Sequence, residues 1–184
     1  MDRRGLLRVA TAGALGLMIS RPAWASLSRA VKVEELVGRS RHVVLGEPLD
    51  AYSVWERIGA RKHIVTYTRV RMLELLAGAR PDQDELLVRT LGGRVGELGE
   101  LVHGEAILTL GTRGLLFVMP TQSVLGVTAM AQGHYPMSRD SGTERLRRSP
   151  EATELLEAGD SAVKRLAGLQ LHEARALVRS VVNK

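Results

Sequence analysis

The chain has 184 residues, a formal net charge of +6 and no cysteine, and aromatic residues make up 3% of it. Without cysteine, disulfide bonds and thiol catalysis are excluded. The length fits one domain, and the scarcity of aromatic residues predicts a core built from aliphatic side chains.

The first 25 residues have the features of an export signal. Arg3 and Arg4 precede an apolar segment at residues 9–19, and Ala23 and Ala25 are the small residues that a signal peptidase reads. We expect cleavage after Ala25. The two arginines begin the order R-R-G-L-L-R, which resembles the twin-arginine export motif, and an ordinary Sec signal is the alternative.

Export would place the mature chain in the periplasm or outside the cell. The apolar segment of the signal is shorter than a membrane span, so we expect no stable membrane anchor after cleavage. Removing residues 1–25 takes away four arginines and one aspartate, which lowers the net charge from +6 to +3.

After the signal, a helix and a bent strand are expected. Residues 27–40 place apolar side chains close to helical spacing, which predicts a short helix on one end of the fold. Residues 43–55 are rich in β-branched and aromatic residues, and Pro48 predicts a bend or bulge within this strand. A hairpin connection is expected at residues 56–62, which include Gly59.

The middle of the chain is predicted to contain strands separated by glycines. Apolar residues and threonines alternate with other residues from Ile64 to Met72, which predicts a strand with one buried face. Further strands are expected at 85–91 and near 106–110, and five glycines between residues 92 and 104 suit corners that need positive φ. Residues 115–119 have no polar face, so both sides of this strand should be covered.

Closing strands are expected at residues 124–137, and the charged residues 139–148 are predicted to form a loop or linker. Ser149 followed by proline and glutamate is a helix start, and that helix is expected to end at Gly159. A last helix presents one apolar stripe, which consists of Leu171, Ala174, Val178 and Val181.

Together these elements predict a mainly β protein with flanking helices, in the α+β class. We expect a small OB-like β-barrel of five to six strands with an N-terminal helix and a C-terminal helical segment. The expected boundaries are residues 1–25 for the signal peptide, 26–140 for the barrel domain with its N-terminal helix, and 141–184 for the linker and C-terminal helices.

Several motifs between residues 36 and 140 carry a resemblance. They are S-R-H-V-V-L-G, I-V-T-Y-T-R-V-R-M-L-E-L-L-A-G, V-R-T-L-G-G-R-V-G, V-H-G, G-T-R-G-L-L-F-V and Q-G-H-Y-P-M. In these motifs the chain resembles an uncharacterised family of small exported bacterial proteins with an OB-like, netrin-module-like barrel. Because the resemblance is carried by glycines and apolar residues at structural positions of these motifs, it implies a fold and no catalytic or binding residue.

No metal site or cofactor is predicted. His172 and Glu173 begin like a zinc-binding helix, but Ala176 stands where the second histidine is needed. A surface zinc site could be formed by His103 and Glu105 with a third ligand across the sheet, His134. Polar residues on strands are more commonly solvated than bound to metal.

No catalytic residue is predicted either, because the mature chain has no G-x-S-x-G motif and no thiol. Glu97, Glu100 and Glu105 cluster in the glycine-rich segment, where two carboxylates could pair for acid–base chemistry. A hydrolase whose site is assembled in three dimensions is therefore the first alternative. It would require a deep polar pocket with a perturbed acid or histidine.

Binding of single-stranded nucleic acid is the second alternative. Tyr67, Arg69 and Arg71 share one face of their predicted strand, as a stacking platform in a basic groove requires. Export, a mature net charge of +3 and sparse aromatic residues make nucleic acid an unlikely ligand.

We therefore expect an exported, non-enzymatic binding module whose partner is another exported protein or peptide. Its binding surface is expected on the outward face of the strand at residues 64–72, or on the loops at 92–104 and 133–136. The candidate surface residues are Tyr67, Arg69, Arg71, His103, Glu105, His134 and Tyr135.

Overall fold

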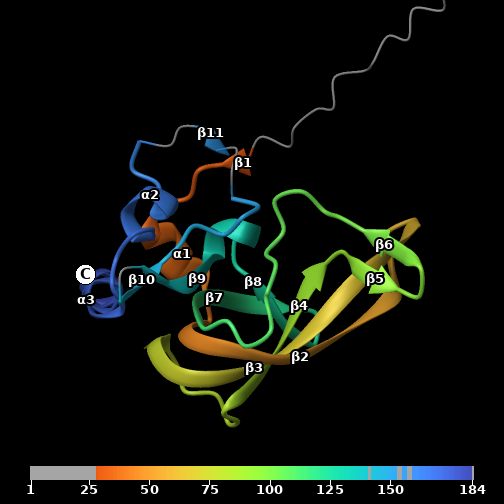
Figure 1. Ribbon diagram of the computed structural model, residues 1–184, viewed down its shortest axis with the longest axis horizontal. Helices are drawn as coiled ribbons and strands as arrows, with labels where there is room; N and C mark the ends of the chain where they lie inside the picture. Colours follow the sequence, from red (N-terminus) through yellow and green to blue (C-terminus); the bar gives the residue numbers. More distant parts are fainter. Residues whose placement is uncertain (1–27, 141, 153–154, 157–158, 184) are drawn as a thin grey trace, which may run out of the picture.

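The computed structural model describes residues 28–183 except 141, 153–154 and 157–158 (Figure 1). The predicted export signal lies outside the described residues. In the part of the chain that is described, no helix is long and apolar enough to cross a membrane.

The chain is mainly β, with short helices flanking the strands (Figure 1). The helices are α1 (Val33–Arg39), α2 (Ala162–Leu166), α3 (Leu171–Val182) and the 3-10 helix η1 (Met130–Gly133). The strands are β1 (Ser28–Arg29), β2 (His42–Ile58), β3 (Arg61–Gly78), β4 (Glu85–Leu91), β5 (Gly93–Val95), β6 (Leu98–Glu100), β7 (Gly114–Thr121), β8 (Val124–Val127), β9 (His134–Asp140), β10 (Thr143–Leu146) and β11 (Leu155–Leu156).

Seven strands form the principal sheet, in the order β10-β9-β7-β2-β3-β4-β8. Strand β8 also pairs with β7, so the pairings among β7, β2, β3, β4 and β8 return to the strand where they began. Within this circuit only the β4–β8 pairing is parallel. The small hairpin β5–β6 stands beside it and pairs only within itself among the described strands.

The long hairpin β2–β3 follows the predicted alternation. Ile64, Thr68 and Val70 are buried on the inner face of β3, whereas Arg69 and Arg71 on the other face are exposed. The register between β2 and β3 shifts at Pro48, because proline has no N–H to donate to the ladder. The predicted bulge at this residue is confirmed.

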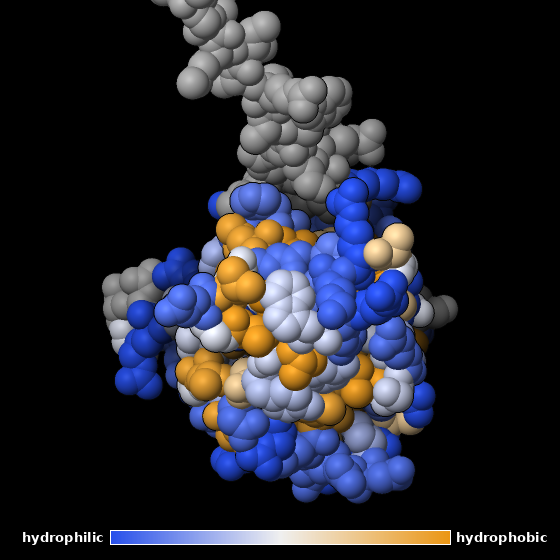
Figure 2. Space-filling view, turned by 90° about the vertical axis from the view of Figure 1, so that its right-hand side faces the viewer, coloured by the Kyte–Doolittle hydropathy of each residue, from blue (hydrophilic) through white to orange (hydrophobic). Residues whose placement is uncertain are grey.

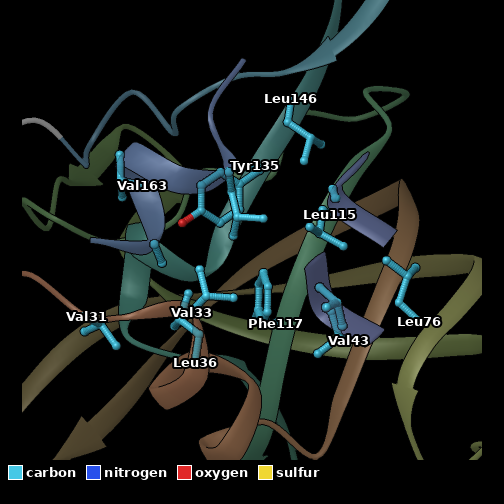
Figure 3. Close-up of a cluster of buried hydrophobic side chains, with 14 of the residues drawn as sticks. Val31, Val33, Leu36, Val43, Leu76, Leu115, Phe117, Tyr135, Leu146 and Val163 are labelled. Carbon is cyan, nitrogen blue, oxygen red and sulfur yellow. The ribbon is translucent and has the colours of Figure 1, made fainter. Parts of the chain in front are cut away.

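Strand β7 is covered on both sides, as its apolar sequence predicts. Leu115 and Phe117 belong to one buried cluster, and Leu116 and Val118 belong to a second cluster on the opposite face. Successive strand side chains point to opposite faces, so β7 divides the two cores. The first core fills the space between β7 and the helices, and Phe117 lies in its middle (Figure 3).

Several predicted elements differ from the observed ones. The charged residues 139–148 are not a linker, because β9 extends to Asp140 and pairs with β10. Residues 106–110 do not form a strand, since the Glu105 side chain takes the N–H of Ala106 that a ladder would need. Strand β8 ends at Val127, where Ala129 and Met130 adopt positive φ and turn the chain into η1.

The helix predicted from Ser149 to Gly159 is also wrong. Ser149 is buried, the chain turns after it, and Leu155–Leu156 pair in parallel with β1. A long-range pairing has therefore overridden a local helix signal. The N-terminal helix is shorter than predicted for the same reason, because residues 28–29 form the partner strand β1 and α1 begins only at Val33.

Candidate functional site

The outward face of β3 carries a row of aromatic and charged side chains. Tyr67 stands opposite Tyr52 on β2 and Arg89 on β4, and the two tyrosine rings stack with centroids 5.4 Å apart. The Tyr67 hydroxyl donates to Glu56, and Arg89 Nη2 donates to the same carboxylate over 2.8 Å. Arg89 and Tyr67 lower the pKa of Glu56, so this carboxylate stays ionised and neutralises Arg89.

Arg69 and Arg89 on this face are engaged with carboxylates. Arg69 donates to Asp50 and lies 3.4 Å from Glu85, so its charge is also paired within the chain. Arg71 is exposed and stands opposite Glu47 and Glu85 in the register of the sheet. The predicted face therefore exists, but acidic residues interleave its arginines and weaken it as an anion-binding groove.

The structure does not bring His103, Glu105 and His134 together. His103 is exposed and lies 3.8 Å from Glu151, whereas Glu105 is buried and bonds to backbone N–H groups. His134 is buried in β9 near Ser149, and burial lowers its pKa to about 4. Within the described ranges, no three His, Asp or Glu side chains are grouped so that they could hold a metal ion.

The prediction that residues 133–136 form a binding loop is wrong. His134 is 4% exposed and Tyr135 is fully buried, because β9 pairs with β7 and turns these side chains into the molecule. The Tyr135 ring meets Phe117 edge to face in the first core, at a centroid distance of 6.1 Å (Figure 3). The closing strand predicted at this end of residues 124–137 is present as β9, and its pairing with β7 leaves no exposed binding loop here.

The segment from β6 to β7 places large apolar side chains in solvent. The exposed fractions are 62% for Leu98, 64% for Leu101, 46% for Ile107 and 52% for Leu110. Figure 2 faces the side on which β5 and β6 lie in Figure 1, and hydrophobic residues, drawn in orange, interrupt the hydrophilic surface there. Contiguous exposed apolar side chains are a feature of binding surfaces, and these four lie within one short segment of the sequence.

Beside Leu101 and Ile107 lies a partly open pocket of about 260 Å³. The inner faces of β3 and β4 form one wall, and the segment after β6 forms the other. Its lining consists of Thr66, Thr68, Thr90, Leu91, Gly92, Gly93, Glu100, Leu101, Val102, Glu105, Ala106, Ile107 and Leu108. The pocket is thus mostly apolar, with three hydroxyl groups and two acidic residues.

Glu105 is the buried acid of this pocket. Its carboxylate accepts the N–H of Leu91 over 3.2 Å and the N–H of Ala106 over 2.9 Å. Burial raises the pKa of Glu105, and the two backbone hydrogen bonds and the charge of Arg89 only partly oppose that rise. The sequence singled out this residue, but as part of a surface rather than as the floor of a pocket.

Glu100 stands at the same pocket in a different environment. Its carboxylate lies 2.7 Å from His63 Nδ1 and accepts the N–H of Ile64 over 2.6 Å, which joins β6 to β3. These two contacts lower the pKa of Glu100. The third acid of the predicted cluster, Glu97, is exposed and does not line the pocket.

The three threonines were missed as site residues. Thr66 stands opposite Thr90 in the sheet, and the Thr66 hydroxyl donates to the Gly92 carbonyl over 2.7 Å. Thr68 and Thr90 are 1% and 6% exposed, and their hydroxyl groups have no hydrogen bond to another described residue. Their position among apolar residues on the buried face of each strand could have identified them as polar groups of an internal site.

A comparison of the chain with protein-family models and with curated proteins found no match. The function must therefore be argued from the geometry and chemistry of these residues.

Proposed function

We propose that this protein is an exported, non-enzymatic binding module that recognises another exported protein or peptide. The observation that carries the proposal is the group of exposed aliphatic side chains between β6 and β7, namely Leu98, Leu101, Ile107 and Leu110. Leaving this apolar area in water costs roughly 25 cal/mol per Å², which a partner that covers it would recover.

This surface overlaps the predicted loop at residues 92–104 and extends beyond it to Leu110, and it suits a partner better than the predicted Tyr67 face. On the Tyr67 face, Arg69 and Arg89 are already bonded to Asp50 and Glu56, so a partner would have to compete with these contacts. A partner that covers Leu98, Leu101, Ile107 and Leu110 would not have to replace such hydrogen bonds. The same pairing of the arginines gives no support to binding of single-stranded nucleic acid.

The fold proposed for the module is an OB-like barrel of five strands, related to the family that the sequence motifs resemble. The closed circuit of pairings among β7, β2, β3, β4 and β8 supports it, as does the parallel contact of Val88 with Leu125. Backbone NOEs between Val88 and Gly126 in the mature protein would test this closure. Their absence would leave an open sheet.

Export is proposed on the signal sequence, with a periplasmic or secreted mature chain. Replacement of Arg3 and Arg4 by lysine should retain the precursor in the cytoplasm if the twin-arginine route is used. Unchanged export of this double variant would instead assign the chain to the Sec route.

The binding proposal is tested with the mature protein, residues 26–184, as bait in the exported fraction of its native cell. One partner should be captured reproducibly, and Leu98→Ser/Leu101→Ser should lose it. Leu73→Ser is the matched control, because Leu73 is 41% exposed but lies on β3 outside this segment. Equal capture by wild type and the double variant would refute the proposed surface.

A hydrolase remains the second candidate because of one specific observation. Glu100 and Glu105 line the same pocket, and their surroundings shift their pKa values in opposite directions. Such divergence is a feature of acid–base pairs. Hydrolysis of a substrate panel by the mature protein, abolished by Glu105→Gln, would establish this alternative in place of a binding module.

A further inference from the structure

The pocket between the apolar segment and the strands β3 and β4 is lined by acidic residues and, among those described, by no basic ones. Glu100 and Glu105 line it, and no Lys, Arg or His of the described chain does so. Arg89 is near enough to affect Glu105, but its guanidinium is bonded to Glu56 on the other face of the sheet. Glu100 already lies 2.7 Å from His63 Nδ1, so Glu105 is the carboxylate that gives the pocket its attraction for a cation.

The polar atoms of the pocket are suited to accepting hydrogen bonds. The Thr66 hydroxyl donates to the Gly92 carbonyl, which leaves the hydroxyl oxygens of Thr68 and Thr90 as acceptors. Each oxygen of Glu105 already accepts one backbone N–H and has one further lone pair to offer. Thr68 and Thr90 are more than nine-tenths buried, and neither hydroxyl has a hydrogen bond within the described chain. An alkylammonium group has three N–H donors and no acceptor, which matches this set.

The size of the pocket and its aliphatic walls restrict which cation it can hold. A volume of about 260 Å³ is smaller than the roughly 300–1,000 Å³ of pockets that hold drug-sized ligands. Its other walls are aliphatic, with Leu91, Leu101, Val102 and Ile107 among them. Such walls accommodate the methylene stem of a lysine side chain while its head reaches the polar end.

We propose that this pocket receives one lysine side chain of the partner, with its ammonium group bound by Glu105, Thr68 and Thr90. The inference rests on the proposed binding function and names the residue type that the surface recognises. The exposed rim formed by Leu101 and Ile107 then contacts the apolar residues that flank the lysine.

The test titrates the isotope-labelled mature protein with Nα-acetyl-lysine amide and, separately, with Nα-acetyl-norleucine amide, which has no ammonium group. The lysine probe should shift the amide resonances of Leu91, Gly92 and Ala106 saturably, whereas norleucine should not. Glu105→Gln and Thr68→Val should each weaken lysine binding, the first by about tenfold or more, because a buried charge-assisted bond is lost. Glu97→Gln is the matched control and should leave the affinity unchanged.

Equal shifts with both probes would mean an apolar site, and no shift with the lysine probe would mean no amine site. Either result overturns the inference, as does unaltered affinity in both pocket variants. The partner-capture experiment reports separately on the proposed function. Capture that depends on Leu98 and Leu101 without lysine binding would keep the binding module and reject its lysine specificity.

Discussion

At the scale of single residues, two buried polar groups that the described residues leave without hydrogen-bond partners lower the stability of the fold. The Tyr135 hydroxyl lies in the first core without a hydrogen-bond partner in the described chain (Figure 3). His42 Nδ1 is in the same situation, and desolvation lowers the pKa of His42. Both groups lose water on folding and gain no partner, so each opposes stability.

Tyr135→Phe is expected to leave the free energy of unfolding within about 1 kcal/mol of wild type, with any change towards greater stability. The reason is that the variant removes an unpaired buried hydroxyl and keeps the ring. Tyr67→Phe is the control, because it removes a hydroxyl bonded to Glu56 and should cost about 1 kcal/mol. Urea unfolding measures both. A loss of more than about 2 kcal/mol in Tyr135→Phe would reveal a hidden partner of the hydroxyl.

The glycines of the hairpin β5–β6 act at the residue scale as well. Gly93 has a φ of 134°, and a β-carbon there would collide with Thr66 Oγ1 and Ser53 Oγ. Gly93→Ala should therefore cost about 2 kcal/mol or more in thermal or urea unfolding. Gly99→Ala should cost far less, since Gly99 has ordinary φ and its nearest neighbour would lie 3.7 Å away. Equal losses would contradict the close approach of these strands.

At the scale of elements, one ion pair fastens the last helix to the sheet. Arg175 on α3 donates to both oxygens of Glu74 on β3, over 2.7 Å and 2.5 Å. Each side chain is 29% exposed, so water screens the pair only in part. The hydrogen bonds from Arg175 are the main cause of the lowered pKa of Glu74. The helix α3 is thus held to the sheet by this bidentate ion pair as well as by its apolar stripe.

Because the folded pKa of Glu74 is lowered from 4.5, its stabilising contribution is complete above that pH and is lost as the pH falls through the folded pKa. Glu74→Gln should cost about 1 kcal/mol at neutral pH, and this cost should shrink in acid. Urea unfolding from pH 7 towards pH 3 measures the difference. Asp84→Asn is the control, because the Arg80–Asp84 pair is 76% and 70% exposed and should contribute little.

At the scale of the whole molecule, the helices α1, α2 and α3 share one core with the sheet. The first buried cluster contains Val33 of α1, Phe117 of β7, Leu166 of α2 and Val178 of α3. The side chain of Gln132 adds a buried bridge, since it accepts the N–H of Val31 over 2.9 Å. The helices α2 and α3 therefore belong to the same packed body as the strands, a point that the sequence left open.

Leu166→Ala should accordingly destabilise the strands as well as the helices. Leu166 is fully buried, so the free energy of unfolding should fall by about 2–5 kcal/mol in a single transition. Hydrogen exchange should accelerate at Phe117 and in α3 together. Val182→Ala, at a side chain that is 53% exposed, is the control. Faster exchange confined to the helices would show two independent units.

The sequence alone determined the elements whose residues repeat with a clear period. The alternation from Ile64 to Met72, the apolar strand of β7 and the stripe of α3 were each predicted within a few residues, because the periodicity of buried residues follows from local geometry. The corner glycines and the bulge at Pro48 follow from intrinsic backbone limits.

Only the tertiary structure decided the features that depend on distant partners. Strand β11 replaces a predicted helix because β1 pairs with it, and Tyr135 is buried because β9 pairs with β7. The pocket arises in the same way, since Thr68 and Glu105 lie on segments that meet only in the folded chain. The periodicity of residues along the chain determines local geometry. Which distant strands pair depends on the packing of the whole chain, and this cannot be predicted from one local pattern.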